Sequence, residues 1–139
     1  MTHVQEVDSQ GYFLMARAFS EGHLPRWPDD PAQFRGHVWV HAGDGLVAAK
    51  YSPGAPLLMA IGYRLGGYDG AMRVNVVLTI VGLIAFYVLA ADLFNASIAA
   101  VCTFVWAFSP MMLFYGQYPL AHAAEICFVV LAMMCAVRW

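Results

Sequence analysis

Two ionisable side chains lie in a part of this chain that is otherwise almost free of charge. Between residues 74 and 137 the only charged side chains are Asp92 and Glu125, and this stretch has no Lys or Arg. Glu125 follows His122 by three residues, so on a helix the two side chains share one face. An ionised Glu within an apolar membrane span costs about 3 kcal/mol unless it is paired or hydrated. The pair either belongs to a functional site or has a simpler structural role, in which His122 is an interfacial anchor and Glu125 extends toward water.

Two further residues that could carry chemistry lie in the polar first half. Asp8 precedes an apolar run at helical spacing, where it could cap the helix or act as a general base at a membrane surface. Lys50 follows the apolar LVAA segment and precedes Ser52-Pro53-Gly54. It is either a solvated lysine at the end of a hairpin or a cation that holds a lipid-linked phosphate at headgroup level. The residues alone leave both alternatives open in each case.

Metal and disulfide chemistry have little support in the pattern. His122 and Glu125 could provide two metal ligands, but a third is not evident, so a divalent metal is only a weak expectation. The chain has three cysteines, Cys102, Cys127 and Cys135, and no CxxC pair. We therefore expect neither a disulfide nor structural zinc. No basic stripe suggests nucleic acid, so none is expected as a partner.

The second half supplies the elements that must position these residues. Apolar stretches cover 74–91, 96–114 and 120–137 in a chain that is 61% hydrophobic and only 12% charged. Each has about 18–19 residues, or roughly 27–29 Å of helix, which just crosses a hydrocarbon core of about 30 Å. The short connections predict antiparallel neighbours. We expect residues 74–139 to form a mainly α bundle of three transmembrane helices, because a soluble hairpin core would leave too little polar surface.

The first half, residues 1–73, is expected to form one juxtamembrane loop. The spacing predicts an amphipathic helix from Asp8 that Gly22 ends. Three prolines in 23–36 predict no regular structure there. Alternation around Gly43-Asp44-Gly45 predicts a β-hairpin over 37–51, and a short apolar helix should follow and end at Gly66-Gly67.

Counting membrane crossings assigns the candidate residues to one side. If the first loop lies on one side, the second span returns to it, and the third span starts there. His122 and Glu125 would then face the same side as Asp8 and Lys50. A single polar site could draw on all four.

The order of motifs resembles a known family. The segments EVDSQGYFLMARAFSEG, KYSPGAPLLMAIGYRLGG and AFSPMMLFYGQYPLAH follow one another with D-x-x-x-Y and K-x-x-P-G patterns. They resemble the N-terminal part of the GT-C glycosyltransferases, in particular the dolichyl-phosphate-mannose-protein mannosyltransferase and aminoarabinose-transferase-like group. The resemblance covers nearly the whole chain.

That resemblance implies a function and a site. It implies inverting transfer of a sugar from a polyprenyl-phosphate carrier to a hydroxyl of a lipid, protein or glycan acceptor, in a bacterial inner or plasma membrane with residues 1–73 extracytoplasmic. Asp8 would be the catalytic carboxylate and Lys50 would hold the carrier phosphate. Tyr51, His122 and Glu125 are expected to contribute to binding of the substrate or the carrier phosphate.

The chain departs from the family in its length. Family members have a span before the catalytic loop and many after it, so we expect a fragment of a longer transferase that could be inactive alone. Two other classes stay open. One is a non-catalytic membrane scaffold. The other is a transporter fragment in which His122 and Glu125 relay protons.

Overall fold

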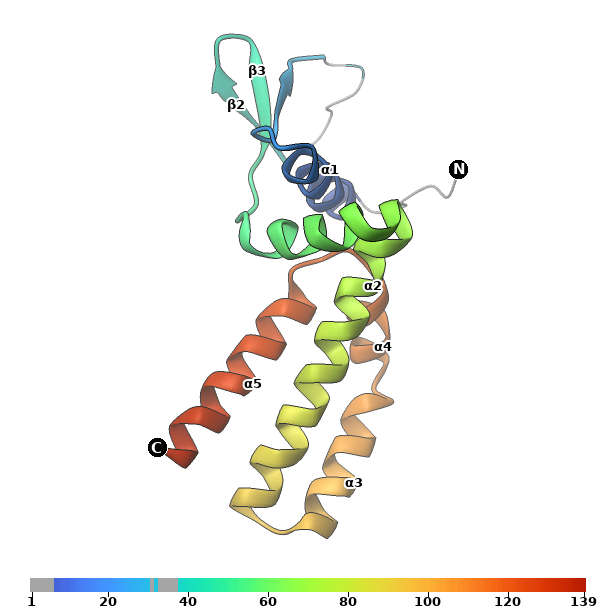
Figure 1. Cartoon of the computed structure of the whole chain (residues 1–139), viewed down its shortest axis with the longest axis vertical. Coiled ribbons are helices and arrows are strands. Elements are labelled where there is room, and N and C mark those ends of the chain that lie inside the picture. The colour runs from blue at the N-terminus through green and yellow to red at the C-terminus, as the bar shows by residue number, and fades with distance from the viewer. Residues whose placement is uncertain (1–6, 31, 33–37) are drawn as a thin grey trace. The chain divides into compact units, whose positions relative to one another are not determined.

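The protein is mainly helical with one small sheet. The computed structural model describes residues 7–30, 32 and 38–139. The chain falls into two compact units, residues 1–72 and 73–139; Figure 1 labels the helices and the strands β2 and β3. The expected mainly α chain with a small β element is confirmed in these coarse terms.

The first unit begins with the amphipathic helix α1, Val7–Glu21. Met15, Ala16 and Ala18 are buried. Gly22 then adopts a φ of 84°, which only glycine reaches without strain. The Gly22 amide donates to the Phe19 carbonyl (3.2 Å) and the His23 amide to the Ala18 carbonyl (3.1 Å), so a Schellman motif ends the helix and turns the chain back.

A three-stranded antiparallel sheet follows, in the order β1-β3-β2. The expected hairpin is present as β2, Trp39–Gly43, and β3, Leu46–Ala49, and φ is positive at Gly43, Asp44 and Gly45, where the chain turns. The third strand, β1 (Arg26–Pro28), lies within 23–36, so the expectation of no regular structure there is wrong. The strand tolerates its proline because β1 is an edge strand and pairs on one side only.

Helix α2, Gly54–Leu93, is long but broken. Gly66 and Gly67 depart from helical geometry, and the φ of Gly67 is 60°. This is where the sequence predicts the short apolar helix to end. Beyond the break, Gly70 comes so close to the Gly62 carbonyl that a side chain at position 70 would overlap it. The two glycines therefore let the segments on either side of the break cross closely.

The second unit contains the rest of α2 and three helices: α3 (Ala96–Ala107), α4 (Pro110–Gln117) and α5 (His122–Arg138). The Asn95 side chain caps α3 by accepting from the Ile98 amide (3.0 Å). At the expected Ser109-Pro110 break, Ser109 caps α4 by accepting from the Met112 amide (3.3 Å).

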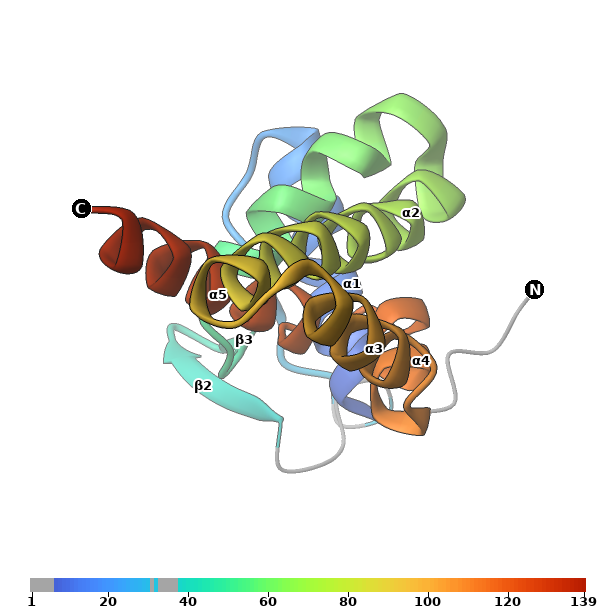
Figure 2. The same ribbon diagram turned by 90° about the horizontal axis from the view of Figure 1, so that it is seen from below.

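Helices α3 and α5 lie on either side of α2 (Figures 1 and 2). A Cβ added at Gly82 would lie 3.3 Å from the Cα of Cys127 in α5, so these helices touch through backbone. Phe86 packs against Trp106 of α3 with ring centres 4.5 Å apart. Ala85, Leu89 and Val130 form the buried centre of this packing.

Two polar contacts mark opposite ends of the second unit. Asn75 is 1% exposed, and its Nδ2 donates to the carbonyls of Tyr118 (2.5 Å) and Leu120 (3.0 Å) in the α4–α5 connection. Arg138, the last residue of α5, donates from Nε to Asp92 near the end of α2 (2.7 Å). Helices α2 and α5 therefore run parallel, with α3 and α4 between them in sequence.

Within the described residues, α2 is the one helix long and apolar enough to cross a membrane. Only 28% of its most apolar window is buried. A second candidate exists if α3 and α4, bent by 61° at Ser109, count as a single span. Helix α5 is shorter, with 17 residues.

Candidate functional site

Asp8 lies in the first turn of α1. The helix begins at Val7, so Asp8 is its second residue and not its N-cap. A carboxylate there interacts favourably with the positive end of the helix dipole.

Tyr51 joins the D-x-x-x-Y segment to the K-x-x-P-G segment. Its hydroxyl donates a 2.6 Å hydrogen bond to Asp8 Oδ1, and its ring stacks on Tyr12 with centroids 4.5 Å apart. Gly11 makes this approach feasible, since a Cβ there would lie 2.9 Å from the Tyr51 ring. Burial raises the pKa of Tyr51, and the hydrogen bond to Asp8 raises it further, so the phenol stays a donor at neutral pH.

Lys50 completes this group. It immediately follows β3, where its amide donates to the Val38 carbonyl (2.9 Å). The side chain is exposed, and its Nζ lies 5.8 Å from the centre of the Tyr51 ring. An exposed cation therefore lies beside the ring whose hydroxyl donates to Asp8.

His122 and Glu125 form a separate pair at the start of α5. His122 Nδ1 lies 3.2 Å from Glu125 Oε2, as expected for neighbours on one helix face. The His122 ring lies against Tyr115 of α4 at 4.4 Å between centroids. Both side chains are well exposed, at 48% and 65%. The pairing lowers the cost of keeping Glu125 near an apolar surface.

The structure thus groups the predicted residues in two sets. Asp8, Lys50 and Tyr51 belong to the first unit, and His122 and Glu125 to the second. Across the described residues, no group of three or more His, Cys, Asp or Glu side chains could hold a metal ion.

Sequence reasoning did not assign a site role to Gly11 or Tyr12. Both are visible in hindsight: a glycine inside an amphipathic helix often marks a close approach, and Tyr12 follows Asp8 by one helical turn. The distance of 43 residues between Asp8 and Tyr51 carries no such local signal.

Comparison of the chain with protein-family models, curated proteins and solved structures gives no match.

Proposed function

We propose that this chain is part of an integral membrane glycosyltransferase that moves a sugar from a polyprenyl-phosphate carrier to an acceptor hydroxyl. One observation carries the proposal. The Tyr51–Asp8 hydrogen bond of 2.6 Å unites the two motifs on which the family resemblance rests. A carboxylate oriented by a phenol, with a lysine beside it, provides a base and a phosphate-binding cation together.

In the proposed reaction, Asp8 takes the proton of the acceptor hydroxyl. The acceptor oxygen attacks the anomeric carbon from the face opposite the phosphate, so the configuration inverts. The bond between that carbon and the phosphate oxygen breaks, and the polyprenyl phosphate leaves with the bonding electrons. Lys50 stabilises the charge that develops on this phosphate.

A membrane location is part of the proposal. We infer three spans, formed by α2, by the bent pair α3–α4 and by α5. From Asn75 to Asp92 the helix rises roughly 26 Å, close to the hydrocarbon thickness of about 30 Å. Large apolar side chains are exposed along all of these helices; examples are Val77, Ile80, Ile84, Val101, Phe104, Val105, Phe128, Val129 and Met133. A lipid environment would solvate them, whereas water would not.

For His122 and Glu125 we propose a role in binding substrate or carrier. Their exposure leaves them accessible, and their pairing gives a donor next to an acceptor. The same pair also supports the alternative that the chain is a transporter fragment. A non-catalytic scaffold is the third alternative.

The test measures sugar transfer by membranes that contain this chain as part of the longer transferase proposed above. The donors are polyprenyl-phosphate mannose and polyprenyl-phosphate aminoarabinose, and the readout is released polyprenyl phosphate. Loss of a general base predicts that Asp8→Asn lowers the rate by about 10²–10⁴-fold. Asp44→Asn is the matched control, because Asp44 is an exposed turn residue with a φ of 52° that Asn tolerates.

Full activity in Asp8→Asn, with wild-type amounts of folded protein, would exclude Asp8 as the base. No turnover of either donor by the wild-type protein would favour the scaffold or the transporter.

A further inference from the structure

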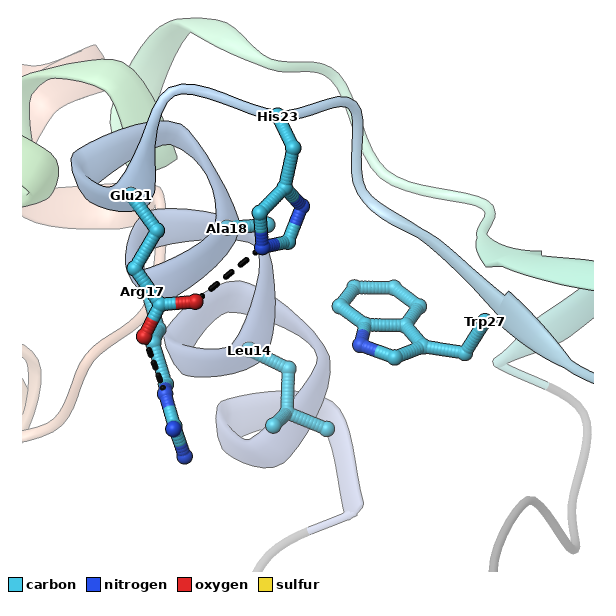
Figure 3. Close-up of a pocket in the computed structure, with 6 residues that line it drawn as sticks. All are labelled: Leu14, Arg17, Ala18, Glu21, His23 and Trp27. Atoms are coloured by element: carbon cyan, nitrogen blue, oxygen red, sulfur yellow. Dashed lines mark hydrogen bonds and ion pairs between the residues drawn. The ribbon is translucent and has the colours of Figure 1, made fainter.

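A second group of polar and aromatic side chains lies in the first unit, apart from Asp8. It surrounds a pocket of about 290 Å³, shown in Figure 3. The lining residues are Leu14, Arg17, Ala18, Glu21, His23 and Trp27. Arg17 lies nine residues beyond Asp8 along α1, which is roughly 14 Å of helix axis. The pocket is therefore distinct from the proposed reaction centre.

The chain builds this pocket from one helix face and the segment that folds back on it. Leu14, Arg17, Ala18 and Glu21 follow the i, i+3, i+4, i+7 spacing of a single face. The Schellman motif at the end of α1 then reverses the chain. It thereby brings His23 and Trp27 back over that face, with the Trp27 indole opposite Leu14 and Ala18 (Figure 3).

The polar side of the pocket is a chain of hydrogen bonds centred on Glu21. Arg17 Nε donates to Oε1 (2.8 Å), and His23 Nε2 lies 3.0 Å from Oε2. His23 Nδ1 lies 3.1 Å from the Leu24 carbonyl. Both imidazole nitrogens face acceptors, so the arrangement favours the doubly protonated ring. The Leu24 carbonyl raises the pKa of His23, and Glu21 raises it further.

The charge balance restricts the ligand. With the doubly protonated His23 the three groups sum to +1, but Arg17 and His23 both already face the Glu21 carboxylate, at 2.8 and 3.0 Å. A carboxylate at the centre repels phosphate, and charged groups at the rim disfavour a lipid tail. A neutral ligand with hydroxyl groups can instead accept from Arg17 and donate to Glu21 at neighbouring positions.

The apolar wall and the size define the rest of the ligand. The Trp27 indole lines the apolar side of the pocket and also contacts the Trp39 ring edge-to-face, with centroids 5.7 Å apart. An indole can pack against the C–H groups on one side of a sugar ring, while the hydroxyl groups of that sugar meet Arg17 and Glu21. A volume of 290 Å³ lies at the lower end of small-molecule sites, about 300–1,000 Å³, which suits one ring. We propose that this pocket binds a single neutral pyranose ring at a distance from the reacting bond. The inference extends the proposed function by adding a second sugar-binding position, but it rests on the pocket alone.

The test uses the full chain in lipid nanodiscs or a detergent without a sugar headgroup. Saturation-transfer NMR and titration measure binding of methyl α-mannopyranoside and methyl β-glucopyranoside. Because Arg17, Glu21 and His23 are about half exposed, we expect a dissociation constant in the millimolar range for at least one glycoside. Loss of the stacking face should weaken binding about tenfold in Trp27→Leu. Trp139→Leu is the control, since Trp139 is fully exposed and distant in sequence.

Arg17→Gln provides a second variant if Trp27→Leu does not fold. We expect it to weaken binding severalfold, whereas Arg26→Gln, which removes the same charge from exposed β1, should not. The absence of saturable glycoside binding would overturn the proposal. So would unchanged binding in both Trp27→Leu and Arg17→Gln, or tighter Trp27-dependent binding of methyl phosphate or uridine.

Asp8→Asn separates this inference from the proposed function. Glycoside binding that persists when transfer is lost supports both proposals. Transfer without glycoside binding overturns only the sugar pocket.

Discussion

The hydroxyl of Tyr51 is the group that defines the Asp8 site at the scale of single residues. Its ring stacks on Tyr12 and lies against Gly11, so packing on two sides fixes its position. The hydrogen bond to Asp8 then restricts the rotation of the carboxylate. An oriented base needs less reorganisation before it accepts a proton.

We predict that Tyr51 makes the stability of the first unit sensitive to alkaline pH. Its pKa is raised above the ordinary 10.0, so the folded state holds the phenol proton more tightly than the unfolded state does. The stabilisation is complete below pH 10 and is lost as pH rises through the folded-state pKa. Denaturant unfolding followed by circular dichroism should show a fall in the free energy of unfolding above pH 10 that is absent in Tyr51→Phe.

At neutral pH the free energy of unfolding of the same variant should fall by about 1.5–3 kcal/mol, the contribution of a hydrogen bond to a charged group. Tyr63→Phe removes another phenol from the first unit and serves as the control. An equal alkaline slope in wild type and Tyr51→Phe would contradict the prediction.

The sequence identifies Asp8 and Lys50 as candidates because each stands at a recognisable boundary between an apolar and a polar run. The family resemblance also includes Tyr51 among the expected binding residues, but nothing in the sequence predicts the hydrogen bond between Tyr51 and Asp8. Tyr51 reaches Asp8 only after the hairpin has folded back on α1, and a contact across 43 residues depends on tertiary packing. The pocket around Glu21 was missed for the same reason, since Trp27 reaches α1 only through the turn at Gly22.

At the scale of elements, the two segments of α2 on either side of its break cross closely, and this crossing determines the shape of the end of the first unit. Gly62 and Gly70 meet across the break at Gly66 and Gly67. Neither segment could approach so closely with side chains at these positions. The break redirects the chain while hydrophobic residues such as Met59 and Ala71 stay buried.

We predict that Gly70→Leu separates the two segments. The added side chain would overlap the Gly62 backbone, which cannot move as a flexible side chain would. Overpacking of this kind costs about 1–3 kcal/mol, measured as a lower thermal unfolding midpoint of the purified chain. Gly54→Ala is the matched control, because a Cβ at Gly54 meets nothing within 4 Å. Equal midpoints for the two variants would argue against a tight crossing.

The helices and turns could be predicted where the sequence signal lies within a few neighbouring residues. Gly22 and the Gly43-Asp44-Gly45 turn adopt the positive φ values that their sequence suggests, and Ser109 caps a new helix before Pro110. Strand β1 was not predictable, because three residues with one proline carry no alternation that distinguishes a strand from a loop. Its strand conformation comes from pairing with β3.

At the scale of the whole helical unit, Asn75 connects parts of the chain that are distant in sequence. It donates to two carbonyls in the α4–α5 connection, 43 and 45 residues later. Those carbonyls lie between helix ends, where helical hydrogen bonds cannot satisfy them. The bond fixes where α5 starts relative to α2, and with it the location of His122 and Glu125 within this unit.

We predict that Asn75→Leu destabilises the helical unit, whereas Thr79→Val does not. The first change removes the donor that reaches the buried Leu120 carbonyl and leaves the Tyr118 carbonyl with the Leu120 amide alone. It should cost about 1–2 kcal/mol, the upper range for hydrogen bonds between apolar helices in a membrane. The second removes a buried hydroxyl for which the described residues provide no partner, and keeps the shape of the side chain. Thermal unfolding in detergent measures both. A larger loss for Thr79→Val than for Asn75→Leu would refute this role of Asn75.

The Asn75 contact also has a consequence for biosynthesis. Its carboxamide emerges from the ribosome well before Tyr118 and Leu120, whose carbonyls it will meet. At about 5–20 residues per second, the delay of 45 residues lasts roughly 2–9 seconds. In the proposed membrane arrangement, α2 carries an unmatched polar group during that interval, which favours its retention beside the translocation machinery until the start of α5 arrives. On that proposal, membrane integration of this unit proceeds as one delayed, concerted event rather than span by span.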